Sequence, residues 1–423
     1  MNLLHKPKKN FLNLYFQVHL PRRLGQFSFF DIGTGRDYFD DDLNQIIVRR
    51  VAKDCYLPAN FLLLKLIQKY PNIRITFSIS GSALKQLEVF APAVVESFQM
   101  LAATGAVEFL SETYYHSLSF LHSKDEFTAQ IEKHTEKVQQ LFGMRPTVFR
   151  NTELIYNDDV GRISHNLGFK GVITEGIDKI LGERSPNYVY QHPDRPTKVF
   201  LRNYRLSDDI AFRCTKKEWS QWPLTPTKYV AWLEVVVKKE ELITLSMDYE
   251  TFGKHHKANT GIFRFLETTL TKVAKHKYIK MVAPSEAIEL LHPVDTIEVP
   301  ESISWADENR DLSAWLGNDL QQDAFDALSK LEEPVKTTGS TTLLNTWRYL
   351  QTSDHFYYMS TKEENDGRMH NYLSPYESPY EAFMNYMNVL SDLSLQIEKH
   401  KDISKIVRRE FTLPETRKRT NSS

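Results

Sequence analysis

The sequence predicts an α/β protein in which a parallel (β/α) barrel is followed by a helical region. Over roughly the first 290 residues, short apolar runs alternate with longer amphipathic stretches, as in parallel strands covered by helices. Seven apolar runs are candidate buried strands: residues 12–18, 73–79, 107–110, 147–150, 170–174, 198–201 and 242–247. This many units in one run favours a barrel over an open sheet. The absence of a GxGxxG turn after the first run argues against a dinucleotide-binding fold.

Helical periodicity separates several of these strands, at residues 59–69, 83–104 and 124–142. Residues 292–303 contain two prolines and have no helical period, so they predict a linker. The predicted domains are therefore a barrel over residues 1–291, this linker, and a C-terminal helical bundle over residues 304–423.

Two patterns predict the helical bundle. Apolar residues fall near one face of a helix at Leu312, Trp315, Leu316, Leu320, Leu328 and Leu331. Residues 378–381, Ser-Pro-Tyr-Glu, combine an N-cap serine with proline at the first helical position and a glutamate three residues past the cap. The polar, basic tail over residues 414–423 is expected to fray.

Composition bounds the partners and the compartment. The chain has 53 Lys and Arg against 54 Asp and Glu, a net charge of −1. This balance gives no electrostatic reason to expect nucleic acid or an anionic membrane as a partner. The sequence has no stretch of about 18 apolar residues, so we expect no transmembrane helix. Cys55 and Cys214 do not make a disulfide framework, and the first residues lack an apolar leader, so we expect a reducing, cytoplasmic compartment.

Polar side chains follow four of the predicted strands, where barrel enzymes place their catalytic groups. The first strand leads to His19, the third to His116, the fourth to Glu153, and the last to Asp248 and Glu250. A single carboxylate at a strand end more often caps a helix or faces solvent, and a lone histidine is more often structural. Four polar strand ends in one barrel are harder to dismiss together, but the pattern alone does not decide between an enzyme and a structural role. Glycoside hydrolysis needs two carboxyl groups across the scissile bond, and Glu153 and Asp248 offer such a pair.

Five segments in order resemble the regions that mark glycoside hydrolase family 57, an α-amylase-type family with an incomplete seven-stranded (β/α) barrel. They are residues 18–21 (Val-His-Leu-Pro), 105–110 with His116 downstream, 149–156 (Phe-Arg-Asn-Thr-Glu-Leu-Ile-Tyr), 247–253 (Met-Asp-Tyr-Glu-Thr-Phe-Gly) and 284–287 (Pro-Ser-Glu-Ala). The third and fourth are the specific ones, and they look most like the α-amylase branch. The chain departs from the family at Leu20, where glutamine is usual, and at Phe149 and Arg150, where the third region often reads Trp-x-x-Glu.

The resemblance implies an irregular seven-stranded barrel and a retaining hydrolase of α-1,4-linked glucans. Because the sequence has no cysteine cluster and no HxxxH motif, we expect catalysis without a metal ion, and we expect no cofactor. Glu153 would be the nucleophile and Asp248 the general acid and base. By the same resemblance, a further set of residues would bind substrate or support the site: His19, Glu108, His116, Arg150, Glu250 and Glu286. The two histidines would donate to the sugar that is cleaved, and Arg150 would lie close to Glu153 and favour its ionised form.

Three alternatives stay open. A 4-α-glucanotransferase would share the glycosyl-enzyme intermediate, and motifs at the catalytic pair do not separate it from a hydrolase. A metal-dependent polysaccharide deacetylase would need an Asp and two His ligands, typically in an HxxxH spacing that the sequence lacks. A non-catalytic glucan-binding protein would have no need of Glu153 and Asp248.

Overall fold

The structure, a computed structural model, describes residues 10–362 and 374–411. Its centre is a curled sheet of seven parallel strands in the order β3-β2-β1-β8-β7-β5-β4. The strands are β1 (Phe11–Val18), β2 (Ile75–Ile79), β3 (Val107–Phe109), β4 (Val148–Arg150), β5 (Gly171–Glu175), β7 (Lys198–Arg202) and β8 (Leu242–Asp248). The irregular seven-stranded barrel predicted from the sequence is confirmed, and each strand lies within two residues of its predicted bounds.

The two outer strands of this order meet just past the end of β3. The Ser111 amide donates to the Val148 carbonyl at 3.1 Å, and the Arg150 amide donates to the Ser111 carbonyl at 2.9 Å. This short bridge brings the C-terminal ends of β3 and β4 together, although their first residues do not pair. Two further strands escaped prediction: β6 (Val189–Gln191) runs antiparallel to β7, and β9 (Lys280–Met281) pairs with the start of β1.

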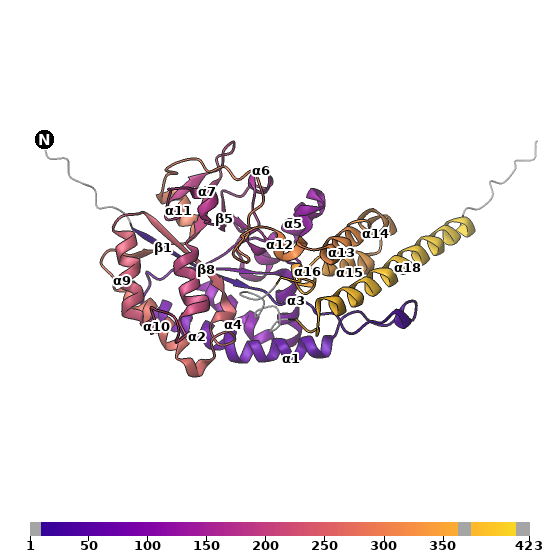
Figure 1. The fold of residues 1–423 in the computed structure, drawn as a ribbon, viewed down its shortest axis with the longest axis horizontal. Helices are drawn as coiled ribbons and strands as arrows, with labels where there is room; N and C mark the ends of the chain where they lie inside the picture. The colour runs from indigo at the N-terminus through magenta and orange to yellow at the C-terminus, as the bar shows by residue number, and fades with distance from the viewer. Residues whose placement is uncertain (1–9, 363–373, 412–423) are drawn as a thin grey trace, which may run out of the picture.

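Helices cover the outside of the barrel, with α9 and α10 on the side away from the C-terminal region (Figure 1). Their bounds are α1 (Asp41–Val51), α2 (Leu57–Lys69), α3 (Gly81–Phe90), α4 (Pro92–Ala103), α5 (Lys124–Phe142), α6 (Asp158–Asn166), α7 (Asp178–Leu181), α8 (Tyr204–Asp208), α9 (Pro226–Val237), α10 (Ile262–Ala274) and α11 (Pro284–Leu290). The single helix predicted over residues 83–104 is wrong, because Pro92 has no N–H to continue α3 and instead opens α4 at its first position.

The C-terminal region, orange to yellow in Figure 1, is helical as predicted. Its helices are α12 (Ser313–Leu316), α13 (Asp319–Ser329), α14 (Glu332–Thr338), α15 (Thr341–Leu350), α16 (Ser353–Tyr357) and α18 (Pro379–Phe411). Ser378 caps α18 by accepting from the Glu381 amide at 3.2 Å. The apolar stripe over Leu312–Leu331 does not form one helix, because Asn318 caps a new helix there and accepts from the Gln321 amide.

Residues 292–303 are extended rather than helical, and they are fastened to the barrel. Ile297 and Val299 are fully buried, and the Ile297 amide donates to the Gln191 carbonyl of β6 at 2.9 Å. The predicted domain boundaries stay a prediction. The tail expected to fray, residues 414–423, lies outside the described residues.

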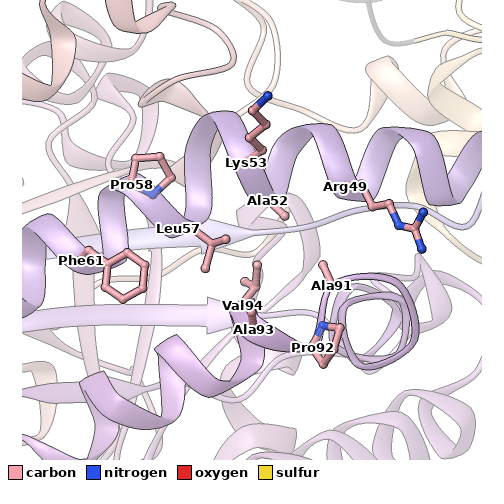
Figure 2. A pocket seen from close by; sticks show the side chains of 10 residues that line it. All are labelled: Arg49, Ala52, Lys53, Leu57, Pro58, Phe61, Ala91, Pro92, Ala93 and Val94. Carbon is pink, nitrogen blue, oxygen red and sulfur yellow. The ribbon is translucent and has the colours of Figure 1, made fainter.

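A surface hollow of about 440 Å³ lies on the helical layer (Figure 2). It is lined by ten side chains: Arg49, Ala52, Lys53, Leu57, Pro58, Phe61, Ala91, Pro92, Ala93 and Val94. It is almost wholly apolar and belongs to α1, α2, α4 and the turns that join them, not to the polar strand ends. None of the helices over residues 10–362 and 374–411 is long and apolar enough to cross a membrane.

The turn after β8 is fixed by a close backbone contact. Gly253 has φ 115°, and a Cβ atom there would lie 2.0 Å from the Asp54 carbonyl oxygen in the π-helical turn η2 (Ala52–Tyr56). The Cys55 thiol of η2 also contacts the turn after β8, because it donates to the Tyr249 carbonyl at 3.3 Å. Only glycine combines this backbone conformation with this approach.

We therefore expect Gly253→Ala to lower the free energy of unfolding by about 2–4 kcal/mol, because strained backbone and overpacking add. Gly35→Ala is the matched control, since Gly35 also has a positive φ of 79° but no atom within 4 Å of the added Cβ. It should cost about 1 kcal/mol. Urea unfolding of both variants measures the difference, and equal losses would contradict the packing argument.

Candidate active site

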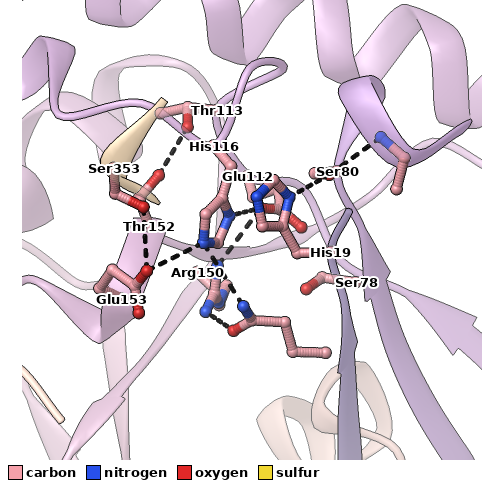
Figure 3. A network of polar contacts seen from close by, with 12 residues as sticks. His19, Ser78, Ser80, Glu112, Thr113, His116, Arg150, Thr152, Glu153 and Ser353 are labelled. Atoms are coloured by element: carbon pink, nitrogen blue, oxygen red, sulfur yellow. Dashed lines mark hydrogen bonds and ion pairs between the residues drawn. The ribbon is translucent and has the colours of Figure 1, made fainter. Parts of the chain in front are cut away.

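Six of the eight predicted site residues gather at the C-terminal ends of the barrel strands: His19, His116, Arg150, Glu153, Asp248 and Glu250. Strand register explains the meeting, because Gln17 of β1 pairs with Asp248 of β8 and the Ser111 bridge aligns β3 with β4. Figure 3 shows the network formed by His19, Glu112, His116, Arg150 and Glu153.

Glu153 lies in a strained turn, η4 (Thr152–Leu154), directly after β4. Its φ is 56° and that of Leu154 is 52°, a left-handed conformation that is uncommon for residues other than glycine. Asn151 holds the turn, because its side chain accepts from the Thr152 amide and donates to the Ile155 carbonyl. The strained backbone of this turn thus orients the Glu153 carboxylate at the C-terminal end of the barrel.

Three side chains donate to the Glu153 carboxylate. His116 Nε2 and Ser353 Oγ reach Oε1 at 3.3 and 2.9 Å, and Trp305 Nε1 reaches Oε2 at 2.7 Å. Burial raises the pKa of Glu153, but the bond to His116, the charge of His116 and the bond from Trp305 outweigh burial and hold the pKa below its usual range. Glu153 is therefore ionised at neutral pH.

His116 is the charged partner of Glu153. Burial disfavours its charged form, yet hydrogen bonds to Glu112 and Glu153 and their two charges raise its pKa to about 9. The ring is therefore protonated at neutral pH, and both nitrogens donate: Nδ1 to Glu112 at 2.9 Å and Nε2 to Glu153 at 3.3 Å. Its own φ of 52° is a second strained backbone position in the site.

Glu112 and Arg150 form a fully buried ion pair behind His116. Arg150 Nη1 lies 3.3 Å from Glu112 Oε2, and Arg150 Nη2 donates to the Gln17 side chain. Burial pushes the pKa of Glu112 up, but Arg150 and His116 overcome this and lower the pKa to about 2. Arg150 was expected beside Glu153. Its side chain donates to Glu112 and Gln17, and the cation bonded to Glu153 is His116.

His19 stacks on His116 with ring centroids 3.9 Å apart and planes 18° from parallel. Burial and the charge of His116 lower the pKa of His19 despite Asp354, so the ring is neutral at neutral pH. Nε2 then donates to Asp354 Oδ2 at 2.9 Å, and Nδ1 accepts from the Ser80 hydroxyl at 2.7 Å. Both nitrogens of each histidine thus have partners in the protein, and their binding of sugar hydroxyls stays a prediction.

Asp248 ends β8 and differs from Glu153 in its protonation. Burial and then the charge of Glu153 raise the pKa of Asp248 to about 6, against the opposing charges of Arg150, Lys254 and His116. Glu250 lies behind it and accepts from the Tyr56 hydroxyl. Burial and the charge of Asp248 raise the pKa of Glu250 to about 7. The site therefore contains one carboxyl group whose pKa is lowered and a neighbour whose pKa is raised toward neutral pH, the arrangement that acid–base chemistry needs.

Sequence reasoning did not select four residues of the site: Glu112, Trp305, Ser353 and Asp354. Glu112 stood in the polar run after the third strand, where it could have been chosen. Ser353 and Asp354 open α16 and Trp305 lies in the loop before α12, so the only local signal was a polar or aromatic residue in a region assigned to a helical bundle.

Glu108 and Glu286 lie elsewhere. Glu108 accepts from the amide and hydroxyl of Ser285, both at 2.9 Å. Glu286 pairs with Arg74, the residue before β2, and accepts from the Ala283 amide at the start of α11. This is the N-terminal end of the barrel, because β9, just before α11, pairs with the first residues of β1. The structure does not bring these two carboxylates together with the other six residues.

Among the residues that the structure describes, no group of three or more His, Cys, Asp or Glu side chains is arranged to hold a metal ion.

Comparison with known proteins gives three kinds of match. The model of the family described as "Glycosyl hydrolase family 57" matches residues 13–300. A Methanocaldococcus jannaschii protein named "Putative alpha-amylase" is 43% identical over 400 residues, which is 91% of this chain and 84% of that protein.

Solved structures share the fold at low identity. A branching enzyme from Thermococcus kodakaraensis has a TM-score of 0.65 at 14% identity, covering 86% of this chain and 87% of its own. The α-amylase AmyC from Thermotoga maritima has a TM-score of 0.58 at 14% identity, covering 93% and 97%. A 4-alpha-glucanotransferase from Thermococcus litoralis has a TM-score of 0.64 at 13% identity. The match covers 82% of this chain but only 56% of that larger protein.

The hydrogen bonds around His116 generate a direct test. Glu112→Gln removes one of the two carboxylates that charge the ring, so we expect the pKa of His116 to fall from about 9 by at least one unit. Histidine NMR titration measures the change. Glu332→Gln, which removes the carboxylate near His122 instead, is the control and should leave His116 unaffected. An unchanged pKa of His116 in the Glu112→Gln protein would show that the ion pair with Glu112 does not set the charge of His116.

Proposed function

The chain belongs to glycosyl hydrolase family 57, and we propose that within this family it is a retaining, α-amylase-like hydrolase of α-1,4-linked glucans. The family match confirms the membership predicted from the sequence motifs. We assign Glu153 as the nucleophile and Asp248 as the general acid and base. The observation that supports this assignment is the opposite displacement of their pKa values within one site.

The proposed first step breaks the glycosidic bond. Asp248 reacts in its protonated form, which burial and the charge of Glu153 favour by raising its pKa to about 6, and gives its proton to the leaving glycosidic oxygen. The ionised Glu153 attacks the anomeric carbon, forming a glycosyl ester as the leaving chain departs with the proton. The strained turn and three donors fix the carboxylate for this attack.

The second step releases the sugar. Once Glu153 is an ester it carries no charge, so one of the causes that raise the pKa of Asp248 disappears. Asp248 is then ionised and takes a proton from water, whose oxygen attacks the anomeric carbon and regenerates the Glu153 carboxylate. Two inversions at that carbon give net retention. The charge of Glu153 thus sets the protonation state of Asp248 in both steps.

The other site residues support this pair in the proposal. His116 keeps Glu153 ionised, Glu112 and Arg150 hold His116, and Asp354 and Ser80 orient His19 beside it. Glu250 is buried near Asp248, whose charge helps to raise the pKa of Glu250 to about 7.

A 4-α-glucanotransferase would follow the same first step and differ in whether a sugar hydroxyl replaces water in the second. Incubation with a maltooligosaccharide of one length, followed by chromatography, separates the two reactions. The proposal predicts only shorter products. A ladder both longer and shorter than the substrate would assign the transferase instead.

Two substitutions test the carboxylate roles. Glu153→Ala should lower kcat by at least about 1,000-fold, and azide should restore turnover with inverted stereochemistry because it replaces the missing nucleophile. Asp248→Ala should lower kcat on starch by about 100- to 10,000-fold, but far less on a glucoside with an activated leaving group, which needs little protonation.

Glu286→Gln is the control, because Glu286 is a carboxylate that the family resemblance suggested but that lies at the far end of the barrel. It should keep kcat within about threefold of the wild type. Wild-type rates in Glu153→Ala, or a loss in Glu286→Gln as large as that in Glu153→Ala, would overturn the assignment.

A further inference from the structure

Trp305, in the loop between the barrel and α12, contacts the proposed nucleophile. We propose that Trp305 is a positioning residue for the reaction: its indole N–H fixes the orientation of the Glu153 carboxylate and keeps it ionised for attack. This inference rests on the proposed function, because it assigns Trp305 a role through Glu153.

Two hydrogen bonds tie Trp305 to Glu153. The indole Nε1 donates to Oε2 at 2.7 Å, and the Trp305 amide donates to the Glu153 carbonyl at 3.2 Å. The other carboxylate oxygen, Oε1, receives His116 and Ser353. Because each oxygen has its own donors, rotation of the carboxylate would break bonds on both sides. An indole N–H is a donor only, so it strengthens the anionic form.

Three arginines hold Trp305, two at its ring and one at its backbone carbonyl. The guanidinium groups of Arg150 and Arg202 lie 5.8 and 5.7 Å from its centroid, within the range of cation–π attraction. Arg310 Nη1 donates to the Trp305 carbonyl at 2.8 Å. The indole therefore lies against the ends of β4 and β7.

The arginines are anchored in turn by buried carboxylates. Arg202 pairs with Glu175 at 2.9 Å and with Asp208 at 2.5 Å, and Arg310 pairs with the same two carboxylates at 2.9 and 3.3 Å. The loop is closed by the Ser304 amide, which donates to the Arg310 carbonyl. Asp307 and Arg310 have φ values of 56° and 53°. These ion pairs and strained backbone positions in one loop are explained if the loop must hold the indole at a fixed place.

The charges that face Glu153 come from three other elements. His116, after β3, lowers its pKa, Asp354 of α16 opposes this, and the charge of Glu153 couples to Asp248 of β8. Trp305 adds a neutral donor that also lowers the pKa of Glu153. Removal of that donor should raise this pKa. The nucleophile must be ionised for attack, so the loss of activity on acidification should then begin at a higher pH.

The experiment compares the full-length wild type with Trp305→Phe, which keeps a ring but has no N–H, and Trp305→Gln, which keeps an N–H but has no ring. The pH dependence of kcat and KM is measured on an activated α-glucoside. In parallel, the Glu153 carboxylate is titrated by infrared difference spectroscopy against Glu153→Gln. Trp305→Phe should move the acidic limb of kcat/KM and the spectroscopic pKa up by about one to two units, because a hydrogen bond to a charged group is lost.

The same variant should lower kcat by about 10- to 100-fold with KM within about threefold, and Trp305→Gln should fall between it and the wild type. Trp347→Phe is the matched control: Trp347 is fully buried and its indole donates to the Leu328 carbonyl at 2.9 Å, within the helical region. It should lower thermal stability without moving the acidic limb. If Trp305→Phe fails to fold, Trp305→Gln is compared with Trp305→Met, which has a similar size and no donor.

An unchanged acidic limb and spectroscopic pKa in Trp305→Phe, with only a lower melting temperature or a higher KM, would overturn the inference. The spectroscopic titration separates this result from a failure of the proposed function. If Glu153→Ala stays active while Trp305→Phe still shifts the titration, the bond is real but Glu153 is not the nucleophile. If Glu153→Ala is inactive and no shift occurs, only the role of Trp305 fails.

Discussion

A protonated histidine between two buried carboxylates is the interaction on which this site depends. His116 donates to Glu112 on one side and to Glu153 on the other. Its bond and charge are the main causes that keep the buried Glu153 ionised, and at Glu112 they add to the larger effect of Arg150. Arg150 completes the balance by pairing with Glu112, so that two cations face the two carboxylates. The network costs desolvation and strained backbone at His116 and Glu153, and both costs fall where the chemistry is proposed.

The helical C-terminal region contributes to this site as well as packing on the barrel. Ser353 and Asp354 at the start of α16 reach Glu153 and His19, and Trp305 approaches from the loop before α12. The core of this region includes barrel-loop residues such as Leu24, Leu118 and Ile155, so the two parts share a hydrophobic interface. Because these contacts arrive from outside the seven strands, the barrel mouth alone does not supply all donors to the nucleophile.

Sequence reasoning found the seven strands because buried parallel strands are continuous apolar runs, and it found Glu153 and Asp248 because polar residues follow such runs directly. It joined α3 and α4 by periodicity, although Pro92 at an N-terminal position signalled the break. It could not find Trp305 or Asp354, since their partners are 152 and 335 positions away and only the fold brings them together. Glu108 and Glu286 matched short motifs, but a motif does not say which end of a strand a side chain lies on.

The central claim, that Glu153 carries the sugar between the two steps, can be tested by trapping that intermediate. The protein would be treated with a 5-fluoro-α-glucosyl fluoride, which forms the ester quickly and releases it slowly, then quenched, digested and examined by tandem mass spectrometry. The account predicts one added sugar per chain, located at Glu153. A label at another carboxylate, or no label together with a β-configured first product by NMR, would contradict it.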